Sequence, residues 1–185
     1  STSRRQRQMC IRDRIKPTTI SWGDSETMKA TGILAEIEQR PECILIRTFQ
    51  DGYSRTQKTY WRRQALSADL FVSGTNALTR QGQLVNVDMI GNRVAGITFG
   101  PEHVVLFIGI NKITDNLEQA MERIRTKAAP LNAIRHPHLH TPCQKTKTCM
   151  NCQSTDRLCN TWTITEKSFP QKRIKIILIN ESLGL

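Results

Sequence analysis

Short apolar runs, several of them apolar at every position, recur along the chain between polar clusters that contain glycine. Runs of this length that are rich in β-branched residues are typical of strands buried on both faces of a parallel sheet. They predict six strands, at 18–22, 43–48, 70–73, 83–87, 103–109 and 174–179.

Helical signals separate these runs. Asp24 and Ser25 predict the start of a helix that runs towards Arg40, where Pro41 would stop it. A polar-faced helix is expected at 57–67. A third, capped by Thr114 and Asp115 and ended by Pro130, carries an apolar stripe at 117, 120, 121 and 124. Strands that alternate with helices predict an α/β fold with a mostly parallel sheet in three layers.

Polar residues follow two of the predicted strands directly. The turn Ser73-Gly74-Thr75-Asn76 comes after one, and Asn111-Lys112 comes after another. In open α/β sheets, ligands bind beyond the carboxyl ends of the strands. We therefore expect a ligand site that includes Gly74, Thr75, Asn76, Asn111 and Lys112.

The strand at 83–87 would deliver Asp88 to the same region, followed by Asn92 and Arg93. Arg93 is the only Lys or Arg between Gln81 and Asn111. A guanidinium is well suited to binding a carboxylate or phosphate, so Asp88, Asn92 and Arg93 are candidate ligand-binding residues. The alternative is that Asp88 and Arg93 only pair with each other and fix the loop.

The net charge of +11 suggests an anionic partner. However, six of the basic residues lie within 1–16, and two Tyr and five Phe provide no set of rings for stacking bases. This pattern disfavours nucleic acid and favours small carboxylates, phosphates or a CoA tail. No apolar run approaches the roughly 20 residues of a membrane span.

The first 14 residues, STSRRQRQMCIRDR, show no hydrophobic period. They are expected to be a disordered or artefactual tail that includes Cys10, with true N-terminal elements missing. Residues 15–185 are then expected to form a single α/β domain.

The segment 131–173 has no clear periodicity and contains four cysteines, Cys143, Cys149, Cys152 and Cys159. Four thiols within so short a stretch can converge on one centre. An iron–sulfur cluster of the [4Fe–4S] type fits four thiolates with cations nearby. Zinc is the alternative, although structural zinc sites usually have two Cys-x2-Cys pairs, and a third option is no metal. Disulfides would need an oxidising compartment, for which nothing argues.

The strings SGTNALT, GNRVAG and AAPLNAIR, followed by the ordered cysteines, resemble the LUD-domain family of lactate-utilisation proteins, and more narrowly its cysteine-bearing branch. The resemblance implies a fold related to ribose-5-phosphate isomerase and CoA-transferase-like proteins. The segment WGDSET is similar to the family's Gly-Gly-Ser-x-Thr segment, which adds Ser25 and Thr27 to the candidate ligand-binding residues. Asp24 replaces the second glycine there, and a plain capped helix is the alternative.

The family implies a part in lactate oxidation but no defined catalytic mechanism. We therefore expect a cytoplasmic oxidoreductase component, an iron–sulfur or metabolite-binding subunit with a redox partner subunit, and a homo-oligomer is an open option. Two alternatives remain: a non-redox enzyme acting on CoA esters or sugar phosphates, and a non-catalytic anion-binding protein with a structural metal site. No Glu in the polar turns offers an acyl-accepting nucleophile, which counts against the first of these.

Overall fold

The predicted parallel sheet forms the centre of the computed structural model, which describes residues 18–185. Its strand order is β2-β1-β3-β6-β9, and every neighbouring pair is parallel. The strands are β1 (Thr19–Trp22), β2 (Ile44–Ile46), β3 (Leu70–Ser73), β6 (His103–Gly109) and β9 (Ile174–Ile179). The expected tail at 1–14, with Cys10, lies outside the described residues.

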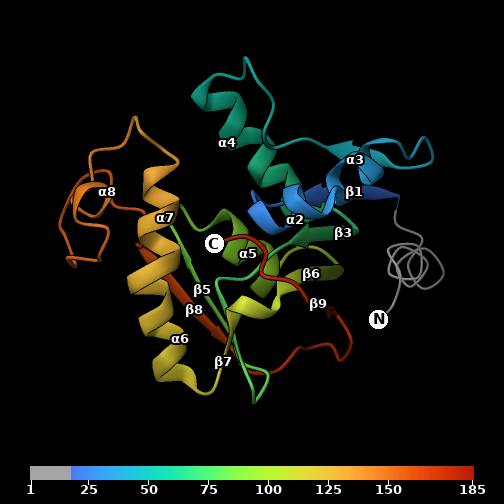
Figure 1. Ribbon diagram of the computed structural model, residues 1–185. Helices are drawn as coiled ribbons and strands as arrows, with labels where there is room; N and C mark the ends of the chain where they lie inside the picture. Colours follow the sequence, from blue (N-terminus) through green and yellow to red (C-terminus); the bar gives the residue numbers. More distant parts are fainter. Residues whose placement is uncertain (1–17) are drawn as a thin grey trace.

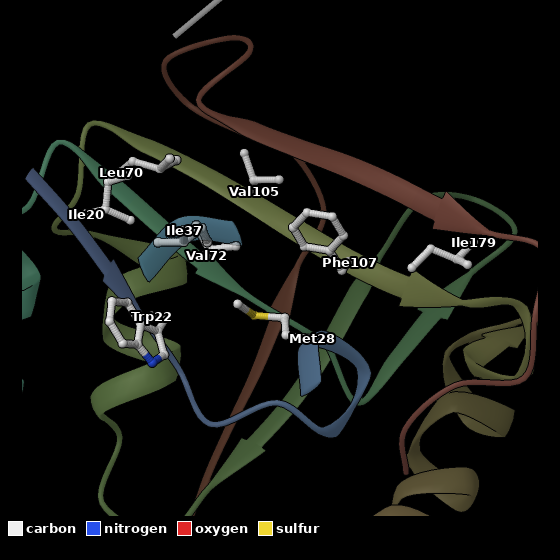
Figure 2. Packing of buried hydrophobic residues seen from close by; sticks show 9 residues of the cluster. All are labelled: Ile20, Trp22, Met28, Ile37, Leu70, Val72, Val105, Phe107 and Ile179. Carbon is white, nitrogen blue, oxygen red and sulfur yellow. The ribbon is translucent and has the colours of Figure 1, made fainter. Parts of the chain in front are cut away.

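One face of this sheet packs on two short helices, α2 (Glu26–Thr31) and α3 (Ile33–Glu38). Figure 2 shows the apolar side chains that fill this interface, with Met28 and Ile37 from the helices among side chains of four strands. The single helix expected here is divided at Gly32, which has φ 72°. Gly32 ends α2 in the left-handed conformation that glycine adopts without strain.

The other face of the sheet packs on α5 (Asn92–Thr98) and on a second sheet that the sequence pattern did not predict as such. The second sheet has the order β7-β4-β5-β8 and is mostly antiparallel. Its strands are β4 (Ala77–Thr79), β5 (Leu84–Asp88), β7 (Ile113–Thr114) and β8 (Thr161–Thr165). The strand expected at 83–87 therefore exists as β5, but in this sheet.

The far side of the second sheet is covered by α6 (Leu117–Arg123) and the wide helical turn that follows it at Ile124–Ala128. Figure 1 shows α6 and α7 (Ala129–Ile134) as one long helical column beside β5 and β8. Both faces of β5 are thus covered, and all five of its residues are buried. This explains why its sequence reads as a continuous buried strand.

Three expectations about these elements are wrong. Pro130 does not end the third helix, because it lies in the first turn of α7, where a proline needs no hydrogen-bond donor. Asn116, not Thr114 or Asp115, caps α6. The strand expected to be buried at 43–48 is β2, which spans only Ile44–Ile46 at the edge of the sheet, and Ile44 is 62% exposed.

The polar helix expected at 57–67 is α4 (Arg55–Gln64), continued by a 3-10 turn at Ala65–Ser67. Ser54 and Gln57 cap it reciprocally. None of the residues of α4 is buried, and Figure 1 shows the helix standing at the upper edge of the molecule. This helix therefore contributes little to the core near the candidate site.

Candidate functional site

The candidate site lies at the carboxyl ends of β1, β3 and β6, where the chain leaves β3 through the turn Gly74-Thr75-Asn76 and enters β4. This is the edge at which ligands bind in parallel α/β sheets. Ser25 and Gly74 approach closely here, since a Cβ atom on Gly74 would stand 2.7 Å from the Ser25 hydroxyl. A larger residue at position 74 would therefore displace the Ser25 hydroxyl, which caps α2.

Each carbonyl of the turn accepts a hydrogen bond from a different cationic side chain. Arg93 donates to the Gly74 oxygen at 3.2 Å, and Lys112 donates to the Thr75 oxygen at 3.2 Å. Arg123 donates to the Asn76 oxygen at 2.6 Å. Three positive side chains from three separate elements therefore surround three consecutive residues.

The Arg93 side chain is fixed by hydrogen bonds and an ion pair with the residues around it. Its guanidinium donates to the side-chain oxygens of Asn76 and Asn86, both at 2.6 Å, and to the Val87 carbonyl at 3.0 Å. It also pairs with Asp88 at 2.7 Å, with both side chains largely buried. The geometry thus fits the interpretation in which Asp88 and Arg93 fix the loop, and it makes Arg93 a positioning residue.

Asn86, which is fully buried, organises the inner side of the turn. Its side-chain oxygen accepts bonds from the Thr75 hydroxyl at 3.0 Å and the Asn76 amide at 3.2 Å, besides that from Arg93. Its amide nitrogen has no hydrogen-bond partner among residues 18–185, and neither does the buried hydroxyl of Ser73. Unsatisfied polar groups of this kind are uncommon in protein interiors.

Lys112 is only 5% exposed, although it carries an ammonium group. Its Nζ atom donates to the Thr27 hydroxyl at 2.9 Å and to the Thr75 carbonyl. Burial, together with the nearby Arg123 and Arg93, lowers the pKa of Lys112 to about 7, while Glu26 acts in the opposite direction. No carboxylate pairs with Lys112 within the described part of the chain.

Arg123 also belongs to this site, although no sequence pattern indicated it. It lies beside the apolar stripe of α6, and no local spacing shows that it reaches Asn76, 47 positions away. Its three hydrogen bonds all go to main-chain oxygens, those of Asn76, Asn111 and Leu185. Burial lowers its pKa, and no Asp or Glu side chain among the described residues pairs with it.

Residues 183–185 lie against this group of cations and hydrogen-bond to the residues around it. The Leu183 carbonyl accepts a bond from the Thr27 hydroxyl at 3.3 Å, and the Leu183 amide donates to the Asn111 side chain at 3.1 Å. Gly184 has φ 71°, and a Cβ atom on it would stand 2.3 Å from the Thr27 hydroxyl. Figure 1 shows the carboxyl end of the chain beside α5, on the side towards α7.

The structure therefore brings together eight of the ten predicted ligand-binding residues: Thr27, Gly74, Thr75, Asn76, Asp88, Arg93, Asn111 and Lys112. Ser25 touches Gly74, but its hydroxyl accepts a bond from the Met28 amide and caps α2. Asn92 is half-buried at the start of α5, next to Arg93.

The four cysteines follow α7 in a segment that contains one short helix, α8 (Cys143–Thr146), and leads into β8. All four are half-buried free thiols. Burial raises the pKa of the Cys159 thiol, Arg157 opposes this increase, and the neighbouring Cys149 and Cys152 thiols add to it. Over residues 18–185, no three His, Cys, Asp or Glu side chains are arranged to hold a metal ion.

The cysteine segment is hydrogen-bonded to the carboxyl end of β5, where Asp88 pairs with Arg93. Asn160, the residue after Cys159, donates from its amide to the Asp88 carbonyl at 3.0 Å and from its side chain to the Met89 carbonyl at 3.0 Å. The Arg157 guanidinium donates to the carbonyls of Cys152 and Cys159. Cys159 therefore stands one residue from a direct contact with Asp88.

The fold and this edge together define an α/β protein in which a parallel sheet presents a cationic cluster at its carboxyl edge. The chain belongs to the LUD domain family, whose family model matches residues 3–179. Among solved structures, the chain is similar to that of a DUF162 family protein from Deinococcus radiodurans. Identity is 13%, coverage is 96% of this chain and 99% of the other, and the TM-score is 0.36.

No curated protein sequence matches the chain. Within the described residues, every helix is too short or too polar to cross a membrane.

Proposed function

We propose that this LUD-domain protein takes part in lactate utilisation as a subunit that binds a small anionic metabolite at the Gly74-Thr75-Asn76 turn and carries an iron–sulfur centre in its cysteine segment. The gathering of Arg93, Lys112 and Arg123 around one turn is the observation that supports binding of an anion. Buried charges in proteins are normally paired. Of these three side chains, Arg93 pairs with Asp88, whereas no Asp or Glu side chain among residues 18–185 pairs with Lys112 or Arg123.

Within this proposal, Lys112 and Arg123 contact the ligand, whereas Arg93 and Asp88 position the turn. The Thr27 hydroxyl and the Asn111 side chain lie beside the two ligand-contacting cations and supply neutral hydrogen-bonding groups. Such groups suit a carboxylate with a neighbouring hydroxyl or carbonyl oxygen. The metabolite class is therefore a small carboxylate or a related anion.

Binding can be tested by adding L-lactate or pyruvate to ¹⁵N-labelled protein and recording the amide spectrum. Shifts are expected for Gly74, Thr75 and Asn76, and Lys112→Met should reduce them. Lys127→Gln, which removes one exposed charge downstream of α6, is the matched control and should leave them unchanged. If none of the small anions tested, including phosphate, shifts these amides in the native chain, the binding proposal is wrong.

The cysteine segment fits an iron–sulfur centre in its donor chemistry. It offers four free thiols, and the Cys149 and Cys152 thiols are near enough to affect the pKa of Cys159. Arg157 places a positive charge among them, which would offset part of the charge of a thiolate-ligated cluster. A bound cluster would supply one-electron transfer, and Cys143, Cys149, Cys152 and Cys159 would hold it.

Purification without oxygen tests this part of the proposal. Iron and acid-labile sulfide are each expected at about four per chain, with a brown colour that fades when the cluster is oxidised. Cys152→Ser should lower both contents, whereas Cys43→Ser, a change far along the sequence from the segment, should not. A colourless protein with one zinc per chain would favour the structural-metal alternative.

A further inference from the structure

We infer that the small carboxylate bound at the Gly74-Thr75-Asn76 turn is a 2-oxo acid such as pyruvate, whose carbonyl carbon the Lys112 amine joins as an imine while Arg123 binds its carboxylate. This inference rests on the proposed function and deepens it, because it names both the substrate class and the reacting atom of the site. The hydrogen bonds of the Lys112 Nζ atom, its burial and the groups around it support this chemistry.

The Lys112 Nζ atom makes the hydrogen bonds of a neutral amine. It donates to the Thr27 hydroxyl at 2.9 Å and to the Thr75 carbonyl at 3.2 Å, and it makes no other bond within residues 18–185. The Thr27 hydroxyl donates in turn to the Leu183 carbonyl, so it accepts from Nζ. An ammonium has three N–H donors, whereas a neutral amine has two and keeps a lone pair. Two neutral acceptors therefore satisfy the amine and leave its lone pair for bonding to carbon.

Lys112 is a buried cationic residue that can lose its charge. The buried cationic side chains among residues 18–185 are Lys112 and Arg173, at 5% and 8% exposed. Arg173 donates to three main-chain carbonyls, and its guanidinium keeps its proton. Burial, Arg123 and Arg93 lower the pKa of Lys112 to about 7 against the effect of Glu26, so much of the amine is neutral at that pH. Desolvation and neighbouring cations are the conditions that make a lysine nucleophilic.

The guanidinium of Arg123 stands beside this amine. Arg123 and Lys112 donate to consecutive carbonyls, those of Asn76 and Thr75, at 2.6 Å and 3.2 Å, and Arg123 is the charged side chain with the largest effect on Lys112. In a 2-oxo acid the carbonyl carbon is bonded directly to the carboxylate. A guanidinium that pairs with the carboxylate, next to an amine that attacks the carbonyl carbon, therefore matches both groups of this substrate class.

The last residues of the chain occupy the space next to both groups. Arg123 donates to an oxygen of Leu185 at 2.9 Å, and a Cβ atom on Gly184 would stand 3.0 Å from the Lys112 Nζ atom. The Leu185 oxygen shows where an acceptor binds Arg123. When residues 183–185 move aside, the carboxylate of the substrate would take this position and its carbonyl carbon would face Nζ.

Imine formation at this amine needs neither an oxidant nor a reductant. The nitrogen lone pair bonds to the carbonyl carbon, the electrons of the C=O π bond move to the oxygen, and the oxygen gains a proton as the nitrogen loses one. The hydroxyl then leaves with the second amine proton as water, and the C=N bond forms. The Thr27 hydroxyl, 2.9 Å from Nζ, is placed to carry protons between the nitrogen and the oxygen.

Reductive trapping of the full chain with pyruvate and sodium cyanoborohydride near pH 7 tests the inference. The reductant converts an imine into a stable secondary amine, so intact mass should show one adduct per chain and peptide mapping should place it on Lys112. Exposed lysines stay protonated at this pH, and mapping separates Lys112 from the α-amino group, which is partly neutral. L-Lactate, which has no carbonyl carbon to attack, should give no adduct.

Variants assign the two roles. Lys112→Met should remove the mapped adduct, whereas Lys127→Gln, which removes an exposed amine, should leave its yield unchanged. Arg123→Gln should slow trapping of pyruvate about tenfold but not that of acetone, which has no carboxylate for Arg123 to bind. Thermal melting checks that each variant folds, and if Lys112→Met does not, the position of the adduct in the native chain decides.

The outcomes separate this inference from the proposed function. If pyruvate shifts the amides of Gly74, Thr75 and Asn76 but leaves no adduct on Lys112, the inference is overturned and the small-anion site remains. Adducts spread over exposed lysines, or a yield that Lys112→Met does not change, would also overturn it. If pyruvate, L-lactate and phosphate shift none of these amides and no adduct forms, both proposals are wrong.

Discussion

The Nζ atom of Lys112 lies 2.9 Å from the Thr27 hydroxyl, and this contact joins the end of β6 to the first turn of α2 across 85 positions of sequence. Neither residue meets a carboxylate there. The Thr27 hydroxyl also donates to the Leu183 carbonyl, so a single threonine connects the buried lysine with the segment that covers it.

The pH dependence of stability should report the burial of Lys112. Its pKa in the folded chain is about 7, below the ordinary value of 10.5, because burial, Arg123 and Arg93 outweigh the opposing effect of Glu26. Between these two values the unfolded chain binds more protons than the folded chain, so this group makes stability rise with pH. Below pH 7 the folded protein carries the full penalty of a buried ammonium.

Lys112→Met should therefore raise the free energy of unfolding most near pH 6 and flatten its rise from about pH 7 to 10. Denaturant titrations of both proteins at several pH values measure this difference. The Lys127→Gln variant serves as the reference, since its charge is exposed. An unchanged slope in Lys112→Met would show that another group titrates in this window.

The Asp88–Arg93 pair should contribute far more to stability than a surface pair of equal length. The Arg93–Asp88 and Arg80–Asp115 contacts are both 2.7 Å, but the first pair is largely buried and the second is well exposed. Asp88→Asn leaves the Arg93 cation without its counter-charge in the interior and should cost about 3 kcal/mol. Urea denaturation measures this loss.

Asp115→Asn is the matched control and should change stability little, because water screens an exposed pair. The double variant Asp88→Asn with Arg93→Met should lose less than the sum of the single changes, since it removes both charges together. A similar small effect at both sites would mean that Asp88 is solvated in solution.

Substitution of Gly184 should free the cations from their main-chain partners. Gly184→Ala forces an unfavourable φ of 71° on alanine and places a Cβ atom against Thr27. Residues 183–185 should then detach, which removes competition for Arg123 and Thr27 and should strengthen anion binding several-fold. Hydrogen exchange at the Leu183 amide and titration with pyruvate and phosphate, followed by the amide spectrum, measure the two effects.

Gly82→Ala provides the comparison, because Gly82 also has a positive φ but has no neighbouring atom within 4 Å of an added Cβ. It should strain its own turn without affecting anion affinity. Weaker binding in Gly184→Ala would show that residues 183–185 form part of the ligand site rather than cover it.

The apolar runs predicted the parallel sheet well, because side chains on both faces of its inner strands are buried. In β6, Val105 and Phe107 pack on the helical side and Val104, Leu106 and Ile108 on the other, so every position from Val104 to Ile108 is apolar. Strand β8 lacks this signal, since its sequence TWTIT is partly exposed at the edge of the second sheet. Strands β4 and β7 are too short to show any period.

The candidate site was predictable where it follows strands along the chain. Gly74, Thr75, Asn76 and Lys112 come directly after β3 and β6, so position alone placed them at one edge. Arg123 was not predictable, because its role depends on how a helix packs across the second sheet. The same is true of residues 183–185, whose contacts with Thr27 and Arg123 arise only in the folded chain.

The bond between the Asn160 amide and the Asp88 carbonyl has a thermodynamic consequence. It puts Cys159 within two peptide links of the network that orients Arg93. If a metal centre forms at the thiols and shifts this strand end, it must change anion affinity by some factor, and the anion must change metal affinity by the same factor. Measured together, the two equilibria would show how strongly the cysteine segment and the anion site communicate across the paired ends of β5 and β8.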